Sequence, residues 1–235
     1  MDDARSGYKS ALRYNHLVTI TTIFFDLDDT LYAAKTGLWR EIKGRIGRYM
    51  HERLGIPADQ APALQQQYFE QYGTTFLGLQ ANYALDVHDF LDFVHGLPLG
   101  DYIKPTPGLR SVLDAIPARK FIFTNADAGH ARRVLNALEL DGCFDGILDI
   151  LAMSPYCKPM PESFGMALKL AGEPDPRRCV MIDDLPRTTR AAREQGLFSI
   201  LYGVSEPHPD ADAVLADFLL LPGLLEKRAL RGEIF

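Results

Sequence analysis

The stretch Val18-Thr-Ile-Thr-Thr-Ile-Phe-Phe25 is followed at once by Asp26-Leu-Asp-Asp-Thr30. Its first part is rich in β-branched and aromatic residues, and its apolar character is too continuous for a half-exposed edge strand. It predicts a buried strand of a parallel sheet, and the abrupt change to acidic residues marks the carboxyl end of that strand. Because ligands of open α/β sheets bind at these ends, we expect chemistry at Asp26 and Asp28.

Strand-like and helix-like segments alternate beyond Pro105 and Pro107. Strands are predicted at 120–124, 147–150, 179–182 and 198–202, and helices near 109–113, 128–139, 161–171 and 187–195. Such alternation implies parallel pairing through right-handed crossovers. The predicted fold class is α/β, a doubly wound parallel sheet of Rossmann-like type.

A helical pattern interrupts this alternation after the first strand. Apolar residues such as Leu38, Ile42 and Ile46 recur at spacings of three or four, which predicts one apolar helix face. We expect a compact helical cap over 36–99, inserted into a core formed by 17–35 and 100–222. Residues 1–16 are polar and aperiodic and are predicted to be a flexible tail.

Composition excludes several classes of function. The 235 residues carry a formal net charge of -6, which gives no basic footprint for a nucleic-acid polymer. No apolar run approaches the roughly 18 residues that span a bilayer. The cysteines, Cys143, Cys157 and Cys179, are scattered and odd in number, which suits a reducing compartment. We expect a cytoplasmic protein, a monomer or a homodimer, that acts on a small molecule.

Further polar residues fall at the carboxyl ends of the other predicted strands. Thr124-Asn125 end one strand, Asp183-Asp184 end another, and Lys158 lies in the loop after a third. Taken singly, each has a structural alternative: an acidic pair could cap a helix, a threonine could bond backbone, and a lysine could be a surface cation. Their convergence on one sheet edge favours a functional site.

This combination of charges suits a cation and a phosphate. Crowded carboxylates raise one another's pKa, and Mg²⁺ relieves the repulsion because it prefers carboxylate and carbonyl oxygens. Lys158 and the Thr124 hydroxyl suit phosphate oxygens. A carboxylate can attack phosphorus and form an aspartyl-phosphate, while the carboxylate two residues later delivers a proton to the leaving group.

Four short segments resemble the motifs of the haloacid dehalogenase superfamily. They are Phe24-Phe25-Asp26-Leu27-Asp28-Asp29-Thr30-Leu31, Phe123-Thr124-Asn125, Lys158-Pro159 and Ile182-Asp183-Asp184. Their order and separations agree with that superfamily over roughly 18–221, and the predicted insertion resembles its type-1 cap, which closes over the substrate.

The resemblance implies a role for each motif residue. Asp26 is the nucleophile, and Asp28 is the general acid and later the general base. Thr124, Asn125 and Lys158 bind the phosphoryl group. Mg²⁺ is held by Asp26, by the Asp28 backbone carbonyl and by the fourth motif, where we favour Asp184 as the direct ligand and Asp183 as its neighbour.

Within the superfamily, the pattern most resembles the pyrimidine 5'-nucleotidases. The segments that carry this resemblance are Leu38-Trp39, Tyr72-Gly73-Thr74-Thr75, Gly78-Leu79, Asp101-Tyr102 and Lys158-Pro159. Trp39 and Tyr72 are the candidate contacts for a nucleobase, with packing inside the cap as the alternative. Leu185 and Thr188 depart from the Ser and Asn that often follow the fourth motif.

The expected function is therefore a Mg²⁺-dependent phosphatase for a small phosphomonoester, with a pyrimidine nucleoside 5'-monophosphate as the favoured substrate. A sugar-phosphate or phosphoglycolate phosphatase is the alternative on the same fold. A haloacid dehalogenase would have no use for Asp28 as an acid. A catalytically idle binding or regulatory protein is the alternative of another class, and the intact set of motif residues argues against it.

Overall fold

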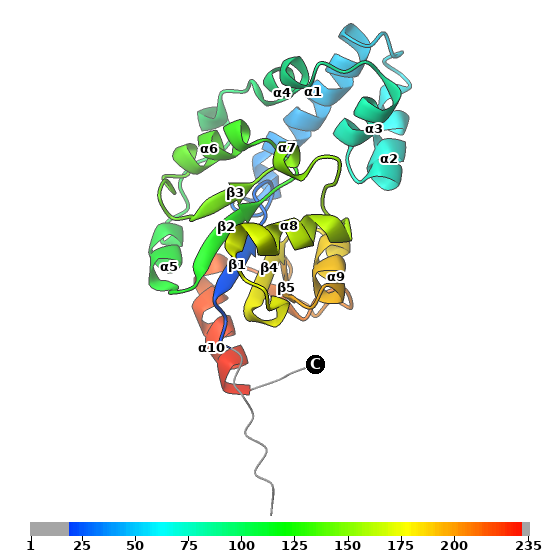
Figure 1. Cartoon of the computed structure of the whole chain (residues 1–235). Coiled ribbons are helices and arrows are strands. Elements are labelled where there is room, and N and C mark those ends of the chain that lie inside the picture. Colours follow the sequence, from blue (N-terminus) through cyan, green and yellow to red (C-terminus); the bar gives the residue numbers. More distant parts are fainter. Residues whose placement is uncertain (1–18, 232–235) are drawn as a thin grey trace, which may run out of the picture.

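A six-stranded, all-parallel sheet forms the centre of the computed structural model, which describes residues 19–231 (Figure 1). The strands are β1 (Thr22–Phe25), β2 (Arg119–Phe123), β3 (Gly146–Leu148), β4 (Cys179–Asp183), β5 (Phe198–Tyr202) and β6 (Ala213–Leu215). They are ordered β3-β2-β1-β4-β5-β6. The chain thus runs from β1 to one edge and returns at β4 to build the other half, which confirms the predicted doubly wound sheet.

β1 is buried along its whole length because helices cover both faces of the sheet. Ile23 and Phe25 point into one hydrophobic cluster, and Phe24 points into another. The first cluster lies under α5 (Leu109–Ala115), α6 (Ala128–Ala137) and α10 (Leu221–Arg231), and the second under α8 (Pro161–Ala171) and α9 (Pro186–Glu194). Burial on both faces explains the continuous apolar run that predicted this strand.

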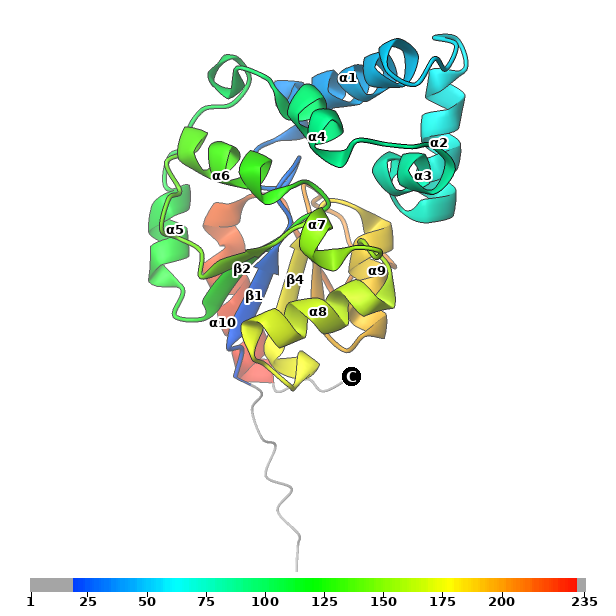
Figure 2. The ribbon, with the colours of Figure 1, turned by 45° about the horizontal axis from the view of Figure 1, so that its top comes forward.

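Helices inserted between β1 and β2 form a separate lobe above the carboxyl ends of the strands (Figure 2). They are α1 (Leu38–Glu52), α2 (Ala61–Tyr72), α3 (Thr75–Asn82) and α4 (Val87–His95). α1 buries Leu38, Ile42 and Ile46 on one face, as its periodicity predicted. Short 3-10 turns, η1 (Ala34–Thr36) and η2 (Leu99–Asp101), flank the insertion. We call this lobe, residues 38–95, the cap.

Four elements were not anticipated from the sequence. They are α3, α7 (Ile150–Met153), β6 and α10. The first of these contains Gly78-Leu79, which carries part of the resemblance to the nucleotidases but for which no helix is predicted. The expected tail at 1–16 lies outside the described residues.

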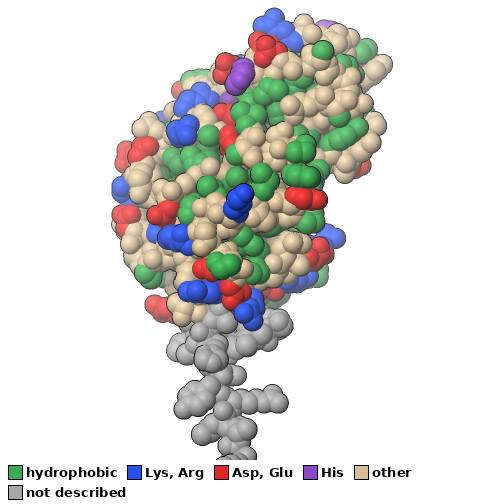
Figure 3. Space-filling view, viewed as in Figure 1, with side chains coloured by type: hydrophobic (Ala, Val, Ile, Leu, Met, Phe, Trp, Pro, Cys, Tyr) green, Lys and Arg blue, Asp and Glu red, His purple; other side chains and the backbone are tan. Residues whose placement is uncertain are grey.

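Three further features concern the surface and the cysteines. No helix within residues 19–231 has both the length and the apolar character needed to cross a membrane. On the face shown in Figure 3, basic and acidic side chains are intermixed over the surface. The side chains of Cys143, Cys157 and Cys179 are buried free thiols.

Candidate active site

The motif side chains meet at the carboxyl edge of the sheet, next to the point where the strand order reverses. Asp26 directly follows β1, and its backbone N–H donates to the Ile182 carbonyl of β4 at 2.9 Å. Thr124 follows β2, and its N–H donates to the Leu148 carbonyl of β3 at 3.0 Å. The sheet ladder therefore continues one residue past each strand, which fixes the site residues on a rigid frame.

A buried lysine joins two of the carboxylates. The Lys158 ammonium lies 2.7 Å from Asp26 Oδ1 and 2.7 Å from Asp183 Oδ2, and its residue is only 3% exposed. Burial alone would lower the pKa of Lys158, but Asp183 and Asp26 together raise it well above its usual range. The lysine is therefore a permanent cation. Burial and the neighbouring carboxylates raise the pKa of Asp26 despite this cation.

Asp28 has a different environment, although it lies two residues from Asp26. Its Oδ1 accepts a hydrogen bond from the Tyr32 hydroxyl at 2.6 Å and lies 2.9 Å from His130 Nε2. Burial acts to raise the pKa of Asp28, but His130 and the Tyr32 hydroxyl outweigh it and hold the pKa below the usual value. The two carboxylates of the first motif are thus driven in opposite directions, which is the pattern of distinct catalytic roles.

The fourth motif separates into one fully engaged carboxylate and one available carboxylate. Asp183 uses Oδ2 on Lys158 and Oδ1 on the Leu185 N–H at 2.9 Å. Asp184 receives a long side-chain contact of 3.4 Å from the Thr30 hydroxyl, and it lines the cavity. Burial and the charge of Asp183 raise the pKa of Asp184 to about 7. This difference supports Asp184 as the direct metal ligand.

A metal ion would fit among the acidic residues of these motifs. Asp26, Asp183 and Asp184 each offer a carboxylate oxygen, and these oxygens lie within 4.8 Å of one another. The elevated pKa of Asp184 reflects repulsion that a divalent cation would relieve. Asp29 is a further, half-buried acid beside this group, and its partial burial and Asp28 raise its pKa to about 6.

Thr124 and Asn125 differ in what they offer a ligand. The Thr124 Oγ1 accepts from the Ala126 N–H at 3.0 Å, and a hydroxyl that accepts such a bond can still donate its proton to a phosphate oxygen. The Asn125 amide bonds the backbone of Lys158 twice, donating to its carbonyl and accepting from its N–H, both at 2.9 Å. Asn125 lines the cavity, and its side-chain amide also holds the loop that carries Lys158.

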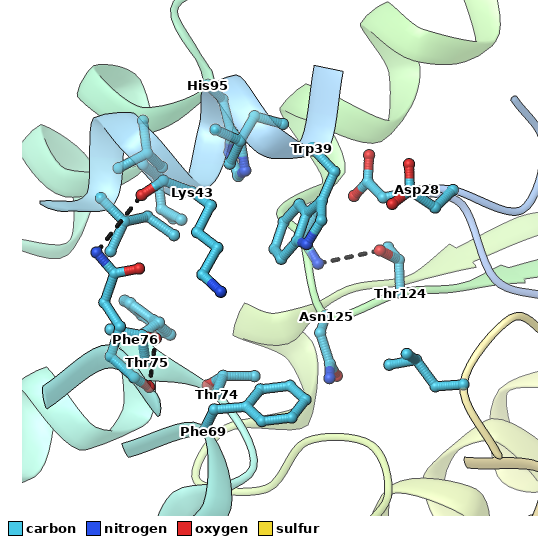
Figure 4. Close-up of a pocket in the computed structure, with 18 of the residues that line it drawn as sticks. Asp28, Trp39, Lys43, Phe69, Thr74, Thr75, Phe76, His95, Thr124 and Asn125 are labelled. Carbon is cyan, nitrogen blue, oxygen red and sulfur yellow. Dashed lines mark hydrogen bonds between the residues drawn. The ribbon is translucent and has the colours of Figure 1, made fainter. Parts of the chain in front are cut away.

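A cavity of about 250 Å³ separates the motif residues from the cap (Figure 4). On the core side it is lined by Asp26, Asp28, Asp29, Thr124, Asn125, Ala126, Asp184 and Leu185. On the cap side it is lined by Trp39, Ile42, Lys43, Ile46, Gln65, Gln66, Phe69, Thr74, Thr75, Phe76, Phe90, Leu91, Val94 and His95. One wall is acidic and polar, and the other is mainly aromatic and aliphatic.

Two of the predicted cap contacts have different positions. Trp39 lies on the cavity wall and is 40% exposed, as a base-stacking residue would be. Tyr72 is not among the residues that line the cavity. Its ring packs edge-on against Tyr68, with centroids 5.6 Å apart, and its hydroxyl accepts from Asn82 at 3.2 Å. The helical phase of α2 turns Tyr72 toward α3, which corrects its assignment as a substrate contact.

Several site residues had no recognisable signal in the sequence. Tyr32 belongs to none of the motifs, yet its hydroxyl donates to Asp28 Oδ1 at 2.6 Å. His95 and His130 lie 35 positions apart and follow no metal-ligand spacing, yet their rings stack with centroids 4.2 Å apart. Arg187 also belongs to none of the motifs. Its guanidinium donates to the Phe69 and Gly73 carbonyls at the end of α2, at 3.3 and 2.8 Å.

Comparison with known proteins gives one family match and many structural ones. The model of the haloacid dehalogenase-like hydrolases matches residues 20–196. Phosphate metabolism protein 8 of Saccharomyces cerevisiae is 28% identical over 224 residues, which cover 86% of this chain and 70% of the yeast protein.

Solved structures share the fold at low identity. The HAD-hydrolase YfnB of Bacillus subtilis, solved bound to magnesium, gives a TM-score of 0.59 at 17% identity, covering 88% of this chain and 99% of its own. A HAD phosphatase from Thermococcus onnurineus gives 0.60 at 16% identity, covering 87% and 97%. L-2-haloacid dehalogenases share the same fold. Fold alone therefore leaves the choice of reaction to the site residues.

Proposed function

We propose a phosphatase activity for this chain, which belongs to the haloacid dehalogenase-like hydrolases. The proposed reaction is Mg²⁺-dependent hydrolysis of a small phosphomonoester through an aspartyl-phosphate on Asp26. The favoured substrate is a pyrimidine nucleoside 5'-monophosphate. The observation that carries the proposal is the pairing of two unlike carboxylates on one cavity wall, Asp26 bonded to Lys158 and Asp28 bonded to Tyr32 and His130.

Asp26 is placed to be the nucleophile. It lines the cavity, its Oδ1 is neutralised by Lys158, and its Oδ2 accepts from the Thr30 hydroxyl at 3.1 Å. In the first step an Asp26 oxygen forms a bond to phosphorus as the bond from phosphorus to the ester oxygen breaks. Lys158 and the Thr124 hydroxyl counter the charge that develops on the phosphoryl oxygens.

Asp28 is placed to move the protons. In the first step it gives its proton to the departing ester oxygen. In the second it takes a proton from water as the water oxygen bonds phosphorus and the Asp26–phosphorus linkage breaks, which releases inorganic phosphate. The pKa of Asp28 lies below its usual value in the protein alone. A bound phosphate group adds negative charge beside it, which raises that pKa toward protonation.

The metal would be held by Asp26 and Asp184. Asp183 would not bind it directly but would hold Lys158 through the bond to its Oδ2. When bound, Mg²⁺ supplies charge neutralisation for the phosphoryl group and for the crowded carboxylates. The half-engaged carboxylate of Asp184 and its raised pKa support this assignment. The Asp28 backbone carbonyl stays a further proposed ligand.

The cavity lining supports a nucleoside over smaller leaving groups. Trp39 and Phe69 offer aromatic surface, and Gln65, Gln66 and Thr75 offer hydrogen-bonding groups on the same side. Aromatic faces stack unpaired bases, whereas a glycolate or a simple sugar would leave this surface uncovered. Asp28 also favours phosphatase over dehalogenase chemistry, because a halide leaving group needs no proton.

The test is phosphate release with Mg²⁺ from a panel of pyrimidine and purine monophosphates, sugar phosphates and phosphoglycolate. Asp26→Asn runs in parallel, and Asp59→Asn, an exposed cap residue, is the control. We expect the highest kcat/KM on UMP or CMP and no turnover by Asp26→Asn. Preference for sugar phosphates would overturn the nucleotide assignment alone. Release from no ester, or equal release by Asp26→Asn, would overturn the catalytic proposal and favour a binding role.

A further inference from the structure

Two stacked histidines connect the cap to Asp28. His130 lies in α6 of the core, His95 is the last residue of α4 in the cap, and their rings lie 4.2 Å apart at an interplanar angle of 19°. On the far side of this stack, His130 Nε2 lies 2.9 Å from Asp28 Oδ1. We propose that His130 is a positioning residue for Asp28. Through the stack with His95, this positioning depends on the cap being packed against α6. The proposal rests on the proposed phosphatase function.

The Asp28 carboxylate is clamped on one oxygen. Within the described part of the chain, the Tyr32 hydroxyl and His130 both bond Oδ1. These two bonds hold Oδ1 and so restrain the rotation of the carboxylate, whose residue forms part of the cavity lining. A proton donor must be held within hydrogen-bond reach of the leaving oxygen, so this clamp determines how well Asp28 meets the substrate.

The ring of His130 is held in an unusual way. Its side chain is fully buried, and its Nδ1 has no hydrogen-bond partner among the residues that the structure describes. Buried ring nitrogens of purely structural histidines are normally satisfied. The orientation of His130 therefore depends on the Nε2 bond to Asp28 and on the stack with His95. Removing either contact should free the ring to turn.

The cap side of the stack is fastened to α6 at separate points. His95 Nδ1 lies 2.6 Å from Asp127 Oδ2, and the His95 carbonyl accepts from the Arg133 guanidinium. Asp127 also caps α6 through its Oδ1, which accepts from the His130 N–H at 2.9 Å. Residues at the start of α6 and within it thus bind His95 of the cap, and the same helix carries His130, which orients Asp28. If the cap moved away from α6, the His95 ring would move with it, and His130 would lose the ring against which it packs.

Comparison of two leaving groups tests the positioning role. p-Nitrophenyl phosphate has a leaving group that departs without a proton, whereas glycerol 2-phosphate needs one. We expect His130→Phe to lower kcat/KM for glycerol 2-phosphate about 30-fold, and for p-nitrophenyl phosphate less than about 3-fold. His130→Gln, which restores an amide donor toward Asp28, should recover part of the loss. His88→Phe, an exposed position on α4, is the control and should change neither.

A second pair of variants, at His95, tests the link to the cap and leaves His130 itself unchanged. The quantity to compare is kcat/KM for glycerol 2-phosphate divided by kcat/KM for p-nitrophenyl phosphate. His95→Phe keeps an aromatic ring packed on His130, so this ratio should stay within about 2-fold of wild type. His95→Ala removes the ring and should lower the ratio about 10-fold. Equal losses on both esters for His130→Phe would overturn the positioning role. An unchanged ratio in His95→Ala would overturn the link to the cap. Absence of turnover by the wild-type protein would instead count against the proposed function.

Discussion

The two walls of the cavity differ in how tightly their side chains are fixed. On the core wall, Asp26 is 8% exposed and bonded to a lysine that is 3% exposed. On the cap wall, Trp39 is 40% exposed, and the lining is mainly apolar. Charged groups in a poorly solvated site must be paired with specific partners, whereas apolar surface tolerates many arrangements of similar volume. On the proposed function, we therefore expect the core residues to determine the reaction and most cap residues to affect substrate preference, with His95, whose ring packs on His130, as the exception.

Loss of Lys158 should lower kcat/KM more than any other substitution considered below, and by a similar factor whatever the leaving group. Lys158→Met leaves Asp26 and Asp183 buried without their shared cation. We expect kcat/KM to fall about 10³-fold on every ester, because the ammonium stabilises the developing phosphoryl charge. Unpaired buried carboxylates should also lower the free energy of unfolding by about 3 kcal/mol.

Lys169→Met, at an exposed position of α8, is the matched control and should preserve both activity and stability. Chemical denaturation and kinetics on three esters measure the two effects. If the loss of kcat/KM in Lys158→Met differed strongly between esters, a core residue would be contributing to substrate selection, which would contradict the proposed difference between the two walls.

Asp184→Asn should separate metal binding from folding. The folded-state pKa of Asp184 is about 7 against a reference value of 3.8, because of burial and Asp183. Between these values the folded state keeps a proton that the unfolded state has released, so the metal-free protein loses stability as pH rises through this window. We expect Asp184→Asn to melt a few degrees above wild type at about pH 8 in EDTA, and with no difference at about pH 3 if both remain folded.

Excess Mg²⁺ should reverse this order at the higher pH. Ligand binding to the folded state stabilises wild type, and the amide variant should gain much less. Thermal melts of both proteins, with Asp59→Asn as the exposed control, provide the measurement. An equal Mg²⁺-induced rise in Tm for wild type and Asp184→Asn would contradict the metal assignment.

The same contrast explains what could be predicted from the sequence. Asp26, Thr124 and Asp183 could be placed because each lies at the carboxyl end of a buried strand, and parallel strands bring these ends together. The predicted helix at 161–171 and strand at 198–202 have the same limits in the structure. These features depend on local periodicity and on a topology with few alternatives.

Other features depend on contacts between distant segments and left no local signal. In α3, Gly78 looks like a helix breaker, but a Cβ there would lie 2.3 Å from Cγ of Tyr68, so close packing of α3 on α2 requires the glycine. The strand β6 has only three residues, too few for a period to be read. The stack of His95 on His130 exists only once the cap lies against α6.

Trp39→Ala should affect only some substrates. If its indole stacks on a base, kcat/KM for UMP should fall about 10-fold, since base stacking contributes about 1–3 kcal/mol. Hydrolysis of glycerol 2-phosphate should stay within about 2-fold, because that leaving group has no ring. Leu170→Ala, an exposed apolar position of α8, is the control. Equal losses on both esters would mean that Trp39 supports the cap rather than contacting substrate.

Arg187→Lys should give the smallest effect, and it tests whether the core also shapes the cap. The guanidinium of this α9 residue lies 3.5 Å from the centroid of the Phe69 ring and donates to the Phe69 and Gly73 carbonyls. Lysine keeps the charge but cannot reproduce the planar fork or the stacking. Since Phe69 lines the cavity, we expect KM for UMP to rise about 3-fold with kcat unchanged, while Arg190→Lys on the exposed side of α9 changes neither.

A double-mutant cycle with Phe69→Leu then identifies the route of the effect. If Arg187 acts on substrate only by holding the Phe69 ring, the second substitution should add little to the first, because the two changes remove the same interaction. Additive effects would mean that Arg187 positions the end of α2 through the carbonyls alone. A fall in kcat on all esters would instead mean that Arg187 supports the catalytic residues of the core. In that case α9 would contribute to the reaction as well as to the cap wall.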